Sequence, residues 1–119
     1  MGVFQIPVGG ALEINVTLTD STATVIVDAS LSAVFIPWFE VNENAGSTAA
    51  LTVDIYDGTT ARYLGDDAGN MWRAFAVTAN KSYKFTQGYR LPKGSYLRVK
   101  SGDAAGKFTV HGLRIPTDQ

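Results

Sequence analysis

Apolar and polar residues alternate one by one along several short segments of this chain, and this alternation constrains the fold more than any other feature. Residues 12–18 read Leu-Glu-Ile-Asn-Val-Thr-Leu, and residues 51–56 read Leu-Thr-Val-Asp-Ile-Tyr. Successive side chains of a β-strand point to opposite faces, so this pattern is typical of strands with one buried face. Apolar residues nowhere recur at helical spacing, and no segment is predicted to be a helix.

Turn residues separate the predicted strands at short intervals. Asp57-Gly58 and Leu91-Pro92-Lys93-Gly94 are strong turn signals. Strands are expected at residues 12–18, 23–29, 32–42, 51–56, 61–64, 71–77, 81–86, 96–100 and 107–115. About eight or nine short strands with regular turns predict an all-β fold, an antiparallel β-sandwich of jelly-roll-like type.

Two local expectations accompany this fold. The strands at 12–18 and 23–29 are expected to form a hairpin across Thr19-Asp20-Ser21. Pro37 lies inside the third predicted strand and cannot donate to a ladder, which predicts either an edge strand or a bulge.

The length of 119 residues is that of one ordinary domain. Residues 1–10 are expected to form an extended N-terminal arm, residues 11–116 a single sandwich, and residues 117–119 a short tail. The net charge is −1 from 10 basic and 11 acidic residues, with no basic stripe, so nucleic acid is not an expected partner. No apolar run approaches the ~20 residues that span a bilayer, so no membrane partner is expected either.

The sequence offers little for catalysis or metal binding. His111 is the only histidine and cysteine is absent, so a zinc site and a cysteine nucleophile lack their residues. Asp66, Asp67 and Asn70 lack the spacing of a calcium loop and predict a solvated loop instead. Glu13, Glu40 and Glu43 lie in or near predicted strands, with no polar context expected to tune them. The chain is therefore predicted to have no catalytic, cofactor-binding or metal-binding residues, and not to be an enzyme.

Three segments together carry a resemblance. A strand ending at Asn42 leads through small residues to Leu51-Thr52-Val53-Asp54-Ile55-Tyr56-Asp57-Gly58, and Leu91-Pro92-Lys93-Gly94-Ser95-Tyr96-Leu97-Arg98-Val99 follows. Gly106-Lys107-Phe108-Thr109-Val110-His111-Gly112 closes the pattern. This arrangement resembles small β-sandwich virion proteins of tailed bacteriophages, although Ser95 stands where that pattern usually has Asp.

The resemblance implies a structural protein of the virion, made in the host cytoplasm. It favours a capsid decoration (cement) protein that binds and stabilises the major capsid shell, and it implies homo-oligomers and a major capsid or other virion protein as partner. A tail or fibre attachment module of a virion remains an alternative. A second alternative is a carbohydrate-binding sandwich that stacks sugars on Trp38, Trp72 or Tyr63.

Aromatic residues are numerous for a small domain, and they either fill the core or form a contact surface. In the strand at 32–42, Trp38 and Phe39 are consecutive, so one of them is expected to face away from the core. The apolar N-terminal arm is expected to gain order on a neighbour's sheet edge. The expected interface residues are Val3, Phe4, Ile6, Val8, Pro37, Trp38, Phe39, Tyr63 and Trp72.

Overall fold

The computed structural model describes residues 11–64 and 72–117 and contains ten strands, with no helix in those ranges. Accordingly, the described residues include no helix that is long and apolar enough to cross a membrane. The strands are β1 (Leu12–Thr17), β2 (Thr24–Ala29), β3 (Val34–Glu43), β4 (Ala49–Tyr56), β5 (Ala61–Tyr63), β6 (Phe75–Val77), β7 (Ser82–Phe85), β8 (Tyr89–Leu91), β9 (Ser95–Ser101) and β10 (Phe108–Pro116).

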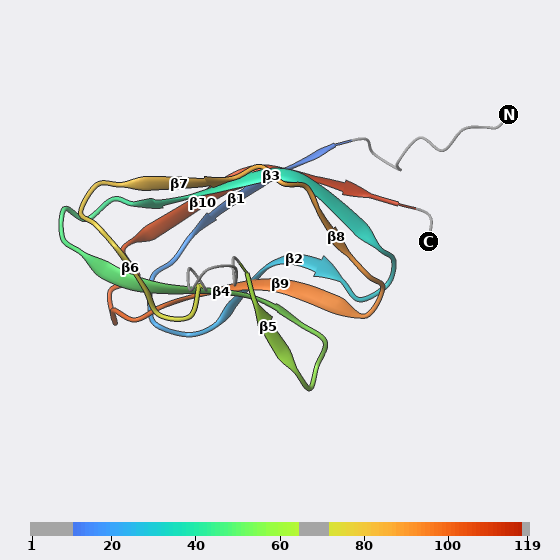
Figure 1. Ribbon diagram of the computed structural model, residues 1–119, viewed down its shortest axis with the longest axis horizontal. Helices are drawn as coiled ribbons and strands as arrows, with labels where there is room; N and C mark the ends of the chain where they lie inside the picture. Colours follow the sequence, from blue (N-terminus) through green and yellow to red (C-terminus); the bar gives the residue numbers. More distant parts are fainter. Residues whose placement is uncertain (1–10, 65–71, 118–119) are drawn as a thin grey trace, which may run out of the picture.

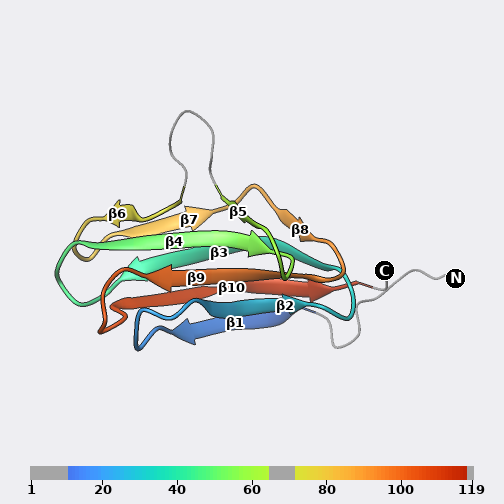
Figure 2. The same cartoon turned by 90° about the horizontal axis from the view of Figure 1, so that it is seen from below.

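Two five-stranded antiparallel sheets lie face to face as the two layers of a sandwich (Figure 1). Sheet A has the order β1-β10-β3-β7, and β8 also pairs with β3. Sheet B has the order β2-β9-β4-β5, and β6 also pairs with β4. Figure 2 shows sheet B from its outer side, with β4, β9 and β2 side by side in front. The predicted antiparallel sandwich is confirmed.

The alternation that predicted the strands sorts their side chains between the core and the outside. In β9, Leu97 and Val99 are fully buried, whereas Arg98 and Lys100 point to the other face. Phe39 and Phe108 are the largest of the fully buried side chains, and they lie on the inner face of sheet A. Burial of apolar side chains between two layers at roughly 25 cal/mol per Å² is the main stabilising term of such a fold.

The expected hairpin of the first two strands is wrong. β1 pairs with β10 in sheet A, and β2 pairs with β9 in sheet B. The segment between them therefore crosses from one sheet to the other. β8 is a further strand that the sequence pattern does not predict.

Pro37 lies in a central strand, so of the two expectations only the bulge is confirmed. On one side of β3, the pairing with β10 jumps from Trp38↔Leu113 to Phe35↔Ile115. On the other side, β7 pairs from Phe39 onwards, while β8 pairs only up to Ile36. The ladder is thus interrupted on both sides of the residue that has no N–H to donate.

Two glycines of the closing segment are required by close approaches. A Cβ on Gly112 would lie 2.7 Å from both the Phe39 Cβ and the Trp38 carbonyl oxygen. Gly106 has a φ of +82°, and a Cβ there would lie 2.2 Å from the Leu18 carbonyl oxygen. The Gly-x-x-x-x-x-Gly spacing therefore reflects how β10 packs on its neighbours.

Candidate functional site

The outer face of sheet A carries an apolar patch formed by Phe35, Trp38, Leu113 and Ile115, and we call this patch, together with Pro37 in the bulge between Phe35 and Trp38, the Trp38 face. Paired residues of antiparallel strands share a face, and Trp38 is opposite Leu113 while Phe35 is opposite Ile115. Phe35 is 39% exposed, and the other four side chains are half-buried. A cluster of this kind on an outer sheet surface is a candidate contact surface.

Charged residues of both signs surround the Trp38 face. Glu13 is opposite Leu113 in β1, and Arg90 is opposite Phe35 in β8. The Lys84 ammonium lies 4.6 Å from the centre of the Trp38 ring, a distance typical of a cation–π contact. An apolar centre with a mixed charged rim is the usual composition of a protein–protein interface.

Two of the expected interface residues lie in the core. Phe39 is fully buried and stacks on Phe85, with ring centres 4.4 Å apart. Trp72 is 6% exposed, and its ring centre lies 4.4 Å from that of Phe75 and 5.0 Å from that of Phe85. In this conformation both residues stabilise the sandwich and offer little surface to a partner. Of the consecutive aromatics, Trp38 is therefore the one that faces outward.

The remaining expected contact residues lie either outside the described residues or outside the Trp38 face. Val3, Phe4, Ile6 and Val8 lie outside the described residues. Tyr63 is half-buried in β5 and is opposite Asp54 of β4, so it belongs to the outer face of sheet B and not to the Trp38 face.

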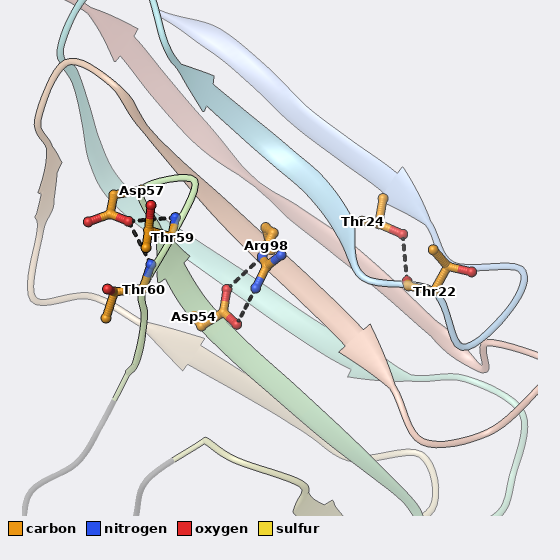
Figure 3. Close-up of polar contacts among 7 residues, drawn as sticks. All are labelled: Thr22, Thr24, Asp54, Asp57, Thr59, Thr60 and Arg98. Atoms are coloured by element: carbon orange, nitrogen blue, oxygen red, sulfur yellow. Dashed lines mark hydrogen bonds and ion pairs between the residues drawn. The ribbon is translucent and has the colours of Figure 1, made fainter.

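An ion pair that the sequence analysis did not find lies on the outer face of sheet B. Arg98 of β9 donates from Nε and Nη2 to the two carboxylate oxygens of Asp54 in β4, each at 3.0 Å (Figure 3). Asp54 is buried, and the Arg98 guanidinium also lies 3.8 Å from the centre of the Tyr56 ring. The hydrogen bond to Asp54 raises the pKa of Arg98 despite the opposing effect of its burial, so the guanidinium stays charged.

The Asp57-Gly58 turn joins β4 to β5 beside this pair (Figure 3). Asp57 accepts hydrogen bonds from the backbone N–H groups of Thr60 at 2.7 Å and Thr59 at 2.9 Å, which lower the pKa of its carboxyl. Gly58 has a φ of +93°, a backbone conformation that glycine adopts without strain. The turn residues thus hold β5 in place against β4.

Glu43 contradicts the expectation that no polar context tunes the strand carboxylates. Its side chain, at the end of β3, is 2% exposed. The carboxylate accepts hydrogen bonds from the backbone N–H groups of three residues: Asn80 at 2.9 Å, Ala45 at 3.1 Å and Gly46 at 3.1 Å. Burial acts to raise the pKa of Glu43, but these hydrogen bonds together lower it. The carboxylate therefore fixes the β3–β4 loop to the β6–β7 turn, which is a structural role.

The residues expected to have no catalytic role are scattered in the structure. His111 is exposed in β10, opposite Glu40 of β3. Within residues 11–64 and 72–117, no three His, Cys, Asp or Glu side chains come together as a metal site would need. Asp66, Asp67 and Asn70 lie outside those ranges.

The stacking platforms of the carbohydrate-binding alternative are poorly placed. Trp72 is buried. Lys84 lies over the ring of Trp38, and the Arg73 guanidinium lies 5.4 Å from the centre of the Tyr63 ring. A sugar stacking on these rings would compete with cations that already occupy them.

Comparison with known proteins identifies the fold. No family model matches the sequence, and no curated protein matches it. A crystal structure of a pentameric capsid protein isolated from metagenomic phage sequences matches with a TM-score of 0.50 and 18% identity, over 91% of this chain and 62% of that chain. A second crystal structure of a pentameric capsid protein from metagenomic phage sequences, solved by iodide phasing, matches with a TM-score of 0.44 and 17% identity, over 91% and 64%.

The chain thus spans less than two thirds of the length of both solved structures. At 18% identity, the first match shows a shared fold and not a shared function, because one fold hosts many functions. The chain has the antiparallel sandwich fold found in that capsid protein.

Proposed function

We propose that this chain is a non-enzymatic structural protein of a phage virion, in which copies of the chain associate with one another through the Trp38 face. The observation that supports it most is the combination of a capsid-protein fold with an outward apolar patch on one sheet. Among its roles in a virion, we favour decoration of the capsid shell, as the sequence resemblance implies.

The strand order supports a jelly-roll type for the sandwich. Strands β1 to β4 alternate between the sheets, and the first and last strands pair in sheet A while β2 and β9 pair in sheet B. This wrapping is what two Greek keys produce, and jelly rolls are frequent among viral capsid domains.

Decoration would work by selective binding. A protein that bridges neighbouring shell subunits binds the assembled shell and not its separated parts, so it stabilises the shell by mass action. Association of copies through the Trp38 face would present several chains to the shell at once, and the N-terminal arm at residues 1–10 is proposed as a second contact through strand addition to a neighbour's sheet.

The first experiment measures self-association. Light scattering during gel filtration, over a range of protein concentrations, should give a mass that is a multiple of the 12.7 kDa chain. Trp38→Ala should weaken self-association by about 2 kcal/mol or more, the range of an interface hot spot. Tyr96→Ala is the matched control, because Tyr96 is a half-buried aromatic on the outer face of sheet B.

The second experiment addresses the shell. Particles of the source phage, stripped of this protein, should bind the wild-type chain and the Tyr96→Ala variant in co-sedimentation, and should bind Trp38→Ala weakly. A monomeric wild-type chain at all concentrations that also fails to co-sediment would refute the proposal.

A further inference from the structure

The outer face of sheet B carries charged side chains at its centre, whereas the centre of the Trp38 face is apolar. The registers place Tyr63, Asp54 and Arg98 in one row across β5, β4 and β9, and place Thr52 beside Lys100 in the next row. Arg73 lies just before β6, with its guanidinium over the Tyr63 ring. Together they surround an open hollow of about 340 Å³, whose lining also includes the small residues Ala23, Ala61 and Ala74.

The lining of this hollow has an excess of positive charge. Among the described residues, it contains three cations, Arg73, Arg98 and Lys100, and one acid, Asp54. Both oxygens of Asp54 are bound to Arg98. The lining that the structure describes therefore carries a net charge of +2 (three cations minus one acid), on a chain whose net charge is −1. Such a local excess in a concave surface attracts anions.

The geometry of the ion pair prepares Arg98 for a second acceptor. Asp54 takes up the Nε–Nη2 edge of the guanidinium, and the Tyr56 ring lies against its face. The guanidinium is thereby fixed in orientation, and its Nη1 group still carries two N–H donors. A preorganised donor loses less entropy when it binds a ligand.

The rest of the lining indicates the class of anion. Ala23, Ala61 and Ala74 are small, so they leave room beside the cations for the backbone of a peptide. The Arg73 guanidinium lies over the Tyr63 ring, and Arg98 lies over the Tyr56 ring, so both aromatic faces that a sugar would need are engaged by cations. Arginine forks match the two oxygens of a carboxylate.

We propose that this hollow binds a carboxylate of an acidic peptide segment of a partner protein, with Arg73, Lys100 and the Nη1 group of Arg98 as donors. The site lies on the opposite side of the sandwich from the Trp38 face. It is thus a second binding surface, independent of the proposed association through sheet A.

The test is an NMR titration of the isolated, ¹⁵N-labelled chain with the blocked peptide acetyl-Ser-Glu-Gly-Glu-Ser-amide. The amide signals of Tyr63, Ala74 and Lys100 should shift in a saturable way. Arg73→Gln and Lys100→Gln should each raise the Kd about 5-fold, which corresponds to the loss of roughly 1 kcal/mol of charge-assisted contact. Raising the salt from about 20 to 200 mM should also weaken binding, because the groups are solvent-accessible.

Arg90→Gln is the matched control, since Arg90 is an exposed arginine of sheet A, away from the hollow, and it should leave the Kd unchanged. Thermal melts of each variant check that it is folded. Four outcomes would overturn the proposal: no saturable shift at these amides, equal binding of the peptide with Gln in place of Glu, equal weakening by Arg90→Gln, or tighter binding of glucuronate than of the peptide. None of them bears on self-association, which is measured separately with Trp38→Ala.

Discussion

Replacing the buried carboxylate of Glu43 tests whether this group organises one end of the sandwich. Oε1 accepts the N–H groups of Asn80 and Gly46, and Oε2 accepts that of Ala45. In Glu43→Gln the amide oxygen can keep the two donors of Oε1, but the amide NH₂ then faces the N–H of Ala45. One hydrogen bond to a charged acceptor is lost, and the remaining two become neutral.

The expected loss follows from those changes. A hydrogen bond to a charged group contributes about 1.5–3 kcal/mol, against about 1 kcal/mol for a neutral one. The neutral amide costs less to bury than the carboxylate, which offsets part of the loss. We expect Glu43→Gln to lower the free energy of unfolding by about 2 kcal/mol at neutral pH. For a domain of this size that corresponds to a Tm lower by roughly 8 °C.

The pH dependence distinguishes this mechanism from a packing defect. The pKa of Glu43 is lower in the folded chain than its ordinary value of 4.5, so its contribution to stability is complete above pH ~4.5 and is lost as the pH falls through the folded pKa. The Tm difference between wild type and Glu43→Gln should therefore be constant from pH 7 to about 5 and should shrink below pH 4.5.

The assay is differential scanning calorimetry across that pH range, with Glu40→Gln as the control. Glu40 lies on the same strand but on its outer face, opposite His111 and Lys84. The control should change the Tm at pH 7 by about 1 °C or less, as a surface substitution does. A Tm for Glu43→Gln within 1–2 °C of wild type, or a Tm difference that stays the same down to pH 3, would refute the reasoning.

Three further substitutions test the fold and the outer faces. Gly112→Ala should lower the free energy of unfolding by about 2 kcal/mol or more in urea, since its Cβ would lie 2.7 Å from Phe39 Cβ and Trp38 O; a neutral effect would contradict the close packing of β10 on β3. Asp54→Asn should lower the free energy of unfolding by about 1.5–3 kcal/mol, because Arg98 would lose a charged partner. In a double-mutant cycle with Arg98→Gln, additive losses would mean that the two side chains do not interact. Deletion of residues 1–10 should leave the urea midpoint unchanged, because β1 begins at Leu12, and a large loss of stability would show that the arm belongs to the core.

The sequence contains enough to predict strands but not their partners. Period-2 alternation depends on which face of a strand is buried, and this is a local property that each segment shows by itself. Pairing depends on which segments meet in space, so β1 was assigned to β2 when it pairs with β10 instead. The Pro37 bulge has a local cause, a missing N–H, and could be foreseen.

The same distinction explains which residues of the candidate surfaces can be predicted from the sequence. Trp38 and Phe39 are neighbours in sequence, so their opposite orientations could be anticipated. The hollow on sheet B could not, because Asp54 and Arg98 are 44 residues apart and meet only through the register of β4 with β9. Glu43 did leave a signal: it has the same parity as Phe39 and Val41, both buried, and so belonged to the inner face of β3.

The two outer faces of the sandwich differ in chemistry although the chain as a whole is nearly neutral. A net charge of −1 predicts weak electrostatic steering for the molecule as a whole. Yet the hollow on sheet B gathers a net +2, while the Trp38 face is apolar at its centre. The outer faces of the two sheets point in opposite directions (Figure 1). One partner therefore cannot cover both surfaces without wrapping around the edge of the sandwich. The association through sheet A should therefore depend little on salt, and the peptide binding on sheet B should depend on it strongly.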